Sequence, residues 1–320
     1  MFSSTQKNME LASGKGEDKP ETVIKTEKSQ SRPEAKGRAV FQPTRENGQV
    51  VAVTNTVLQY TYPLKLLLPQ NVSETKTCQW LYVITFGGGL VAGDNIQLDI
   101  ELAEECTVVV TTQASTKVFH RVDDLVTCQT VEAKVGAGSL LVFLPDPVVC
   151  YKDAAYRQKQ VFHLKQGSSL VLLDWYTSGR IARGECWEFQ SYHSTNSIHL
   201  DDRLVFRDVV HLQDTPLLPV HQAMAQYNVV GMCVLIGPAL SNLYNKLLKE
   251  LGRSKPYGYK YNMEVVLSVS PLRFKKEEEE IHGAVVRVMA FTTTQVFTEM
   301  ERILQELFPR LGGNPFENKY

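Results

Sequence analysis

Three stretches of this 320-residue sequence share one pattern: Leu102-Ala-Glu-Glu-Cys-Thr-Val-Val109, Val135-Gly-Ala-Gly-Ser-Leu-Leu-Val142 and Leu164-Lys-Gln-Gly-Ser-Ser-Leu-Val171. Each begins with an apolar residue, passes through small or polar turn residues and a Ser or Cys, and ends in an apolar strand. The copies lie 33 and 29 residues apart, which suits a coiled sheet whose rungs stack on one another. The alternative interpretation is that the three stretches belong to unrelated β-hairpins, because any two β-hairpins look alike over eight positions.

The sequence around these copies, residues 39 to about 220, consists of short apolar runs enriched in Val, Thr, Phe and Tyr. Gly, Pro and acidic clusters separate the runs, which have the length of strands, and no helix of ordinary length fits among them. An all-β region of this size must close, stack or coil to protect its edge strands. We therefore predict a mainly β fold of coiled, solenoid-like (β-helix-like) stacked sheets.

The pattern changes after residue 220. Leucines recur at helical spacing after Gly237-Pro238, and a second apolar helix face follows Thr292 to Thr294. The order of elements is β-α-β-β-α, which adds two helices to the β body. The predicted strands are 227–236, 262–270 and 283–291.

The chain divides into a tail and one composite domain. Residues 1–38 are polar, rich in both charges and interrupted by Gly and Pro, so they cannot bury enough apolar area to order themselves. We predict a disordered tail at 1–38 and a single domain at 39–320. Within the domain we expect a β body at 39–225, a mixed α/β part at 226–311 and an irregular C-terminus at 312–320.

Charge and cysteine usage exclude several classes of protein. Lys and Arg total 34 against 35 Asp and Glu, so the net charge of −1 supplies no field to attract nucleic acid or an anionic membrane. No apolar run is long enough to span a bilayer, which predicts a soluble protein. The six cysteines are scattered and contain no CxxC pair, so we expect reduced, mostly buried thiols and a cytoplasmic location.

Two polar motifs do not match known catalytic loops. Phe86-Gly-Gly-Gly-Leu-Val-Ala-Gly-Asp94 fits neither GxGxxG nor GxxxxGK[ST], and a strand instead of a helix follows it. Thr111-Thr-Gln-Ala-Ser-Thr-Lys-Val-Phe-His120 contains Ser, Lys and His, but no GxSxG turn accompanies them. The glycines are best explained by turns or close backbone approach, and a nucleophile in the second motif is disfavoured.

Carboxylates and histidines leave an enzymatic alternative open. Two of the carboxylates could form the acid/base pair of a β-solenoid carbohydrate-active enzyme, and the candidates are Asp94, Asp99, Asp146, Asp153, Asp174 and Glu185. The spacing of the histidines and Cys186 reproduces no known metal-ligand set; these residues are Cys186, His193, His199, His211 and His221. Arg180 and Glu185 are more simply explained as an ion pair that fixes a corner of the sheet.

Five strings, taken together and in order, resemble the urease accessory protein D family, also called UreD or UreH. They are Gly88-Gly-Leu-Val-Ala-Gly-Asp94, Thr111-Thr-Gln-Ala-Ser-Thr-Lys-Val-Phe119, Leu144-Pro-Asp-Pro147, Ser178-Gly-Arg-Ile-Ala-Arg-Gly-Glu185 and Asp202-Arg-Leu204. The resemblance covers roughly residues 49 to 311 and looks like the eukaryotic branch. It implies a coiled β body with two helices.

The resemblance also implies a function. It points to a non-enzymatic scaffold that docks on apo-urease and, with accessory proteins F and G, delivers nickel, which is in transit and not a permanent cofactor. Asp94 and Glu185 match acidic positions expected to line or support an internal nickel passage. The motif residues expected to be structural are Gly88, Gly89, Gly93, Thr112, Lys117, Pro145, Asp146, Pro147, Gly179, Arg180 and Gly184.

Two departures from the family pattern limit what carries over. Thr85-Phe86 stands where many bacterial members have His-Pro or Pro-Pro before the glycines, so a ligand role at that entry does not carry over. The ending Asn314-Pro-Phe-Glu-Asn-Lys-Tyr320 lacks a Pro-Arg-aromatic sequence. The contacts made by this end have to come from the structure.

Overall fold

The computed structural model describes residues 34–69, 75–252, 264–274, 282–317 and 319. Residues 31–320 group into one unit. The first strand, β1 (Ala35–Glu46), begins at Ala35, so the sheet takes in the last four residues of the segment predicted to be a disordered tail. Residues 1–33 of that predicted tail lie outside the described residues.

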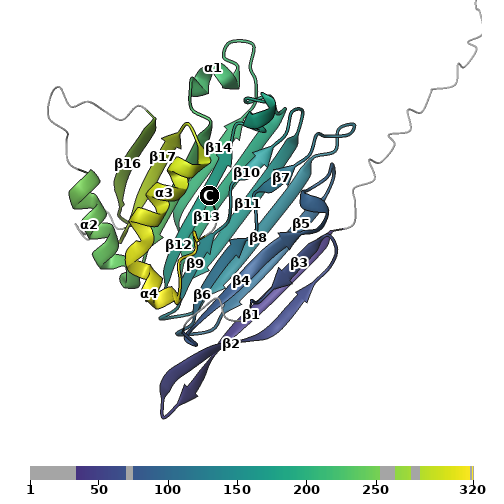
Figure 1. The fold of residues 1–320 in the computed structure, drawn as a ribbon. Coiled ribbons are helices and arrows are strands. Elements are labelled where there is room, and N and C mark those ends of the chain that lie inside the picture. Colours follow the sequence, from purple (N-terminus) through teal and green to yellow (C-terminus); the bar gives the residue numbers. More distant parts are fainter. Residues whose placement is uncertain (1–33, 70–74, 253–263, 275–281, 318, 320) are drawn as a thin grey trace, which may run out of the picture. The chain divides into compact units, whose positions relative to one another are not determined.

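The first sheet has seven strands in the order β14-β13-β11-β8-β5-β1-β2 (Figure 1). Its central strands β1, β5, β8, β11 and β13 all run parallel, and antiparallel strands β2 and β14 form its two edges. The bounds after β1 are β2 (Gln49–Tyr60), β5 (Asn95–Leu102), β8 (Thr127–Val135), β11 (Ala155–Leu164), β13 (Ser191–Leu200) and β14 (Arg203–Leu212).

The second sheet has the order β16-β17-β15-β12-β9-β6-β4-β3, with the short strands β7 and β10 paired beside it. Strands β4, β6, β9 and β12 are parallel, whereas β3 and the C-terminal strands are antiparallel. The bounds are β3 (Leu64–Leu67), β4 (Cys78–Thr85), β6 (Thr107–Thr112), β7 (Thr116–Val118), β9 (Leu140–Leu144), β10 (Val148–Cys150), β12 (Ser169–Thr177), β15 (Val229–Ile236), β16 (Val265–Leu272) and β17 (Gly283–Ala290).

The repeated sequence forms the corners at which the chain passes from the first sheet to the second. The three copies join β5 to β6, β8 to β9 and β11 to β12, so each coil contributes one strand to each sheet. Neighbouring corners bond to each other, because Leu140 N donates to Cys106 O and Ser169 N donates to Ser139 O, each at 2.8 Å. The predicted solenoid-like coil of stacked sheets is therefore confirmed.

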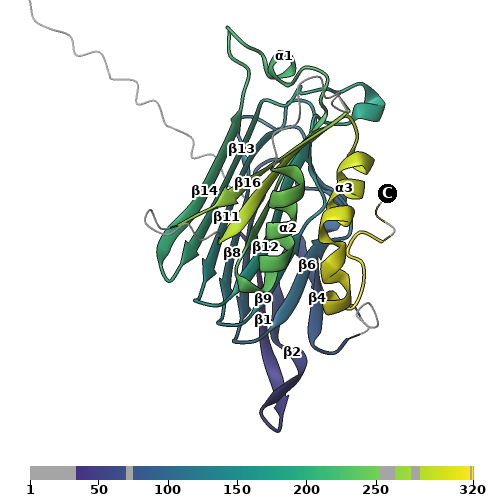
Figure 2. The same cartoon turned by 90° about the vertical axis from the view of Figure 1, so that its left-hand side faces the viewer.

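Helices cover the outer face of the second sheet (Figures 1 and 2). One apolar core lies between the sheets and includes Leu98 and Leu172; the other lies under the helices and includes Leu173 and Met300. The predicted β-α-β-β-α order is confirmed, although β15 starts at Val229 because a short helix and turn precede it. The helices are α1 (Val220–Met224), α2 (Ser241–Leu251), α3 (Thr293–Leu304) and α4 (Phe308–Leu311), with single turns η1 (Phe86–Gly88), η2 (Ile181–Arg183), η3 (Pro238–Leu240) and η4 (Gln305–Leu307).

Four of the six cysteines behave as core residues. All six are free, and four of them are buried. Burial raises the pKa of the Cys78 and Cys233 thiols to about 12, so these groups stay protonated and unreactive at neutral pH. None of the helices in the described ranges is both long and apolar enough to cross a membrane.

Candidate functional site

A buried polar cluster lies between the two sheets, where an apolar core is expected. Asp174 points inward from β12, and its carboxylate accepts hydrogen bonds from Gln158 Nε2 at 2.9 Å, Ser194 Oγ at 2.9 Å and Asn196 Nδ2 at 2.6 Å. Burial raises the pKa of Asp174, while the three donors act against that shift by stabilising the carboxylate. The donors come from β11 and β13, so the cluster joins the two sheets.

The same region contains polar atoms that packing does not satisfy. The buried atoms Gln160 Oε1, Asn196 Oδ1 and Tyr192 Oη have no hydrogen-bond partner among the described residues. An unpaired buried polar atom costs about 1–3 kcal/mol, so these three atoms mark a place where a bound water or ion would be stabilised.

Two adjoining cavities lie between this cluster and the glycine motif. The smaller has a volume of about 30 Å³ and is lined by Asp146, Gln158, Gln160 and Asp174 among others. The larger, of about 180 Å³, lies beside Gly88 and Gly89. Both cavities are lined by Val83, Thr112, Thr116 and Gln129. Polar side chains therefore border two adjoining cavities between the glycine motif and the interior, and we call this pair of cavities the polar path.

The glycine motif is shaped by close backbone contact with β7. A Cβ atom at Gly89 would lie 2.7 Å from Lys117 O, which excludes any other residue without movement of the backbone. Leu90 N donates to the same carbonyl at 2.8 Å. Asp94 is buried at the end of the motif, and its Oδ2 atom accepts from Val91 N at 2.9 Å. Gly89 and Lys117 thus line the larger cavity, and Asp94 fixes the turn after Leu90 without lining that cavity.

Glu185 forms the ion pair expected with Arg180. Arg180 Nε donates to Glu185 Oε2 at 2.8 Å, and the guanidinium lies 4.0 Å from the Tyr151 ring centre. The hydrogen bond from Arg180 is the main cause that holds the pKa of Glu185 below its usual range. Gly179 supports the corner with a backbone φ of 131°. Within the described part of the chain, neither Asp94 nor Glu185 is among the residues that line the two cavities.

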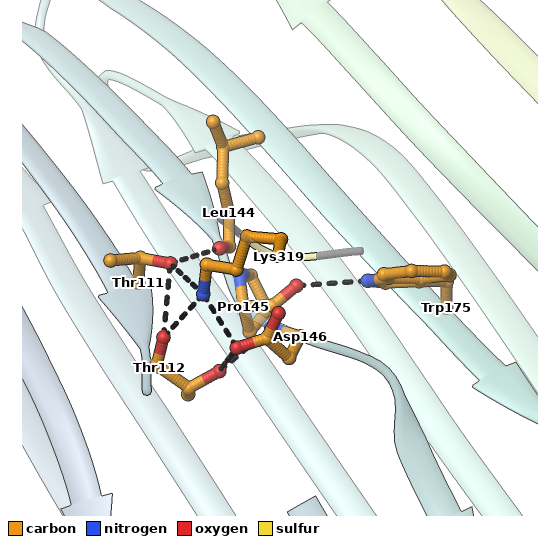
Figure 3. Close-up of polar contacts among 7 residues, drawn as sticks. All are labelled: Thr111, Thr112, Leu144, Pro145, Asp146, Trp175 and Lys319. Atoms are coloured by element: carbon orange, nitrogen blue, oxygen red, sulfur yellow. Dashed lines mark hydrogen bonds and ion pairs between the residues drawn. The ribbon is translucent and has the colours of Figure 1, made fainter. Parts of the chain in front are cut away.

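The Pro145-Asp146-Pro147 corner is a hydrogen-bonded centre of its own (Figure 3). Thr112 Oγ1 donates to Asp146 Oδ2 at 2.8 Å and accepts from Asp146 N at 2.7 Å, while Trp175 Nε1 donates to Pro145 O at 2.8 Å. Lys319 Nζ donates to Asp146 Oδ2 at 2.6 Å. Asp146 therefore contacts both the small cavity and the C-terminal end of the chain.

Sequence reasoning missed several of these residues. Lys319 carries no local signal, because nothing in its neighbours points to a partner 173 positions away. Gln158 and Gln160 had a signal, since they alternate with the charged residues Arg157 and Lys159, and alternate residues of a strand such as β11 face opposite sides of the sheet. Asp174 was among the candidate carboxylates, but its three partners were not foreseen.

The histidines pair across the first sheet without forming a larger group. His163 stacks on His199 with ring centres 5.1 Å apart, whereas the rings of His193 and His211 are tilted, with centres 5.3 Å apart. Across the described residues, no three or more His, Cys, Asp or Glu side chains are grouped so that they could hold a metal ion. The candidate site is thus a polar path with separated carboxylates.

The comparisons with known proteins agree on one family. A family model described as UreD urease accessory protein matches residues 35–319. The chain is 37% identical to urease accessory protein D of Arabidopsis thaliana over 80% of this chain and 92% of that protein. It is 36% identical to urease accessory protein D of Oryza sativa subsp. indica over 80% and 88%, and 37% identical to urease accessory protein UreD of Sorangium cellulosum over 81% and 77%. With the coiled sheets and the ordered motifs, these matches show that the chain belongs to the UreD family of urease accessory proteins.

Proposed function

We propose that this chain assists urease maturation as a non-enzymatic cytoplasmic scaffold. It docks on apo-urease and, together with accessory proteins F and G, delivers nickel to the urease active site. Membership of the UreD family is the main support for this role. The polar path between the sheets is the structural feature that suits it.

The chemistry of the path fits an ion in transit. Nickel accepts carboxylate, carbonyl and amide oxygen, and those of Asp146, Asp174, Gln158 and Gln160 border the small cavity. A transit route must bind nickel weakly enough to release it. Carboxylates that do not form a closed ligand set bind nickel more weakly than a complete set does. Asp94 and Glu185 enter the proposal as residues that support this route, because each fixes a loop through its carboxylate.

Reconstitution tests the proposal. Apo-urease, accessory proteins F and G, nickel, GTP and bicarbonate are combined with and without the purified chain, and urease activity is measured. We expect activation only when the chain is present. Equal activity without it would show that the chain has no part in maturation.

No observation favours the carbohydrate-active alternative. Asp146 and Asp174 are the two candidate carboxylates that line one cavity, and its volume of about 30 Å³ accommodates only one or two water molecules. A retaining or inverting glycosidase needs two carboxylates about 5 to 10 Å apart with a sugar between them.

A further inference from the structure

The C-terminal segment crosses the outer face of the second sheet after α4 ends. Phe316 is buried against Phe297 and Phe308, with ring centres 6.2 and 6.4 Å apart. Asn314 Nδ2 donates to Glu301 Oε1 at 2.6 Å. These contacts attach the segment to α3 and α4, and Lys319, three residues after Phe316, reaches Asp146.

The ammonium group of Lys319 is surrounded by oxygen atoms (Figure 3). It donates to Asp146 Oδ2 at 2.6 Å, to Thr112 O at 2.5 Å and to Thr111 Oγ1 at 3.4 Å. An ammonium has three N–H donors, so all of them are used. The side chains of Lys319 and Asp146 are only 11% and 5% exposed, which means that the pair is shielded from solvent.

The oxygen atoms that hold Lys319 belong to residues of the small cavity. Thr111, Thr112 and Asp146 all line it, so the site lies between the C-terminal segment and the polar path. Removing one partner of a buried ion pair leaves a charge that burial makes costly. If Lys319 withdraws, the Asp146 carboxylate must therefore recruit another cation or a proton.

We propose that Asp146, Thr111 and the Thr112 carbonyl form a nickel-binding site that Lys319 occupies in the free chain. A carboxylate, a hydroxyl and a backbone carbonyl are oxygen ligands that divalent cations accept. Lys319 and nickel compete for the same oxygens, so the lysine weakens metal binding and promotes release. This inference rests on the proposed nickel-transfer function, because that function supplies the cation.

Calorimetric titration of the purified full-length chain with Ni²⁺ alone tests the competition. Lys319→Met removes the ammonium and keeps much of the stem, and we expect it to bind one nickel ion about tenfold more tightly than the wild type, within the usual range of such couplings. Lys319→Arg keeps the charge and should bind as the wild type does. Lys246→Met is the control, because Lys246 forms an exposed ion pair with Glu306.

The double variant Lys319→Met/Asp146→Asn should lose the gain in affinity. A folded Lys319→Met variant that binds nickel no better than the wild type, or a double variant that retains the gain, would overturn the proposal. Folding is checked by thermal unfolding of each variant.

Amine labelling of the wild type gives a second test that needs no substitution. Nickel should increase labelling of Lys319 several-fold relative to Lys246, and unchanged labelling at saturating nickel would contradict the inference. Both measurements use the isolated chain. A negative result in these measurements would contradict the Lys319 competition alone. The proposed function is tested separately, by urease activity in the reconstituted system.

Discussion

At the scale of single residues, Asp174 is the most unusual group in the core. Its carboxylate lies between two sheets whose facing side chains are mostly apolar apart from the polar cluster around it. Burial raises its pKa, and the donors Gln158, Ser194 and Asn196 only partly offset the effect, since desolvation is the largest cause. Asp174 therefore destabilises the folded chain at any pH at which its carboxyl group is ionised.

We predict that Asp174→Asn makes stability less dependent on pH. Because the pKa of Asp174 is higher in the folded chain than the usual value of about 3.9, its contribution to stability is fully present below that value and is lost as pH rises through the folded-state pKa. The free energy of unfolding of the variant, relative to the wild type, should rise with pH from about pH 4 upward. Denaturant unfolding at a series of pH values measures it.

The exposed turn residue Asp202 gives the matched control for this prediction. Its φ of 66° is one that Asn also adopts, so Asp202→Asn should leave the backbone unchanged. A difference between Asp174→Asn and the wild type that stays constant with pH would contradict the assignment of Asp174 as the costly group.

At the scale of elements, the corners of the coil determine how the strands stack. Ser139 belongs to the middle corner, and its Oγ atom accepts from Cys106 N at 2.9 Å and donates to Ala103 O at 2.6 Å. This buried hydroxyl connects two successive coils. The third corner differs, because Ser168 Oγ donates to Lys165 O within its own turn.

Ser139→Ala should destabilise the chain more than Ser168→Ala. The first substitution leaves the buried Cys106 amide and the partly buried Ala103 carbonyl without this partner and should cost about 2 kcal/mol, whereas the second removes one local bond worth about 1 kcal/mol. Urea unfolding of both variants provides the comparison. Equal losses would mean that bonds between coils contribute no more than bonds within a turn.

The elements were largely predictable because their signals are local. The repeat around Ser139 identified the corners, and the apolar spacing before Leu251 and Leu304 identified the helices, each from residues close in sequence. The helix at Thr293 is also started locally, by a Thr292 and Gln295 capping box. The ends of β1 and β15 were placed less well, because pairing with neighbouring strands sets where a strand begins.

At the scale of the whole unit formed by residues 31–320, two cores of different kinds share the second sheet. Helices bury its outer face, and the first sheet buries its inner face with a polar path included. Trp175 illustrates the division: its ring meets Phe297 of α3 at 4.8 Å, and its indole N–H donates to Pro145 O at the Asp146 corner. The helices thus help to position the path.

Narrowing the path should lower urease activation without loss of the fold. Thr116 lines both cavities, so Thr116→Leu adds volume where they meet, while Thr116→Val keeps the size of the side chain. In the reconstituted system, we expect Thr116→Leu to reduce activation about tenfold and Thr116→Val to retain most of it, a difference of about 1.4 kcal/mol. Equal activation with both variants, each still bound to accessory protein F, would exclude transit through these cavities.

The sequence by itself determined the β class, the coiled corners, the two C-terminal helices and, through five ordered motifs, the family. These features follow from alternation, turn residues and spacing, which neighbouring residues encode. Only the tertiary structure brought Asp174 to Gln158 and Asn196, and Lys319 to Asp146. The contacts of Asp174 depend on the register in which coils about 30 residues long stack on one another. The contact of Lys319 depends on where the helices place the C-terminal segment. No local stretch of sequence contains that information.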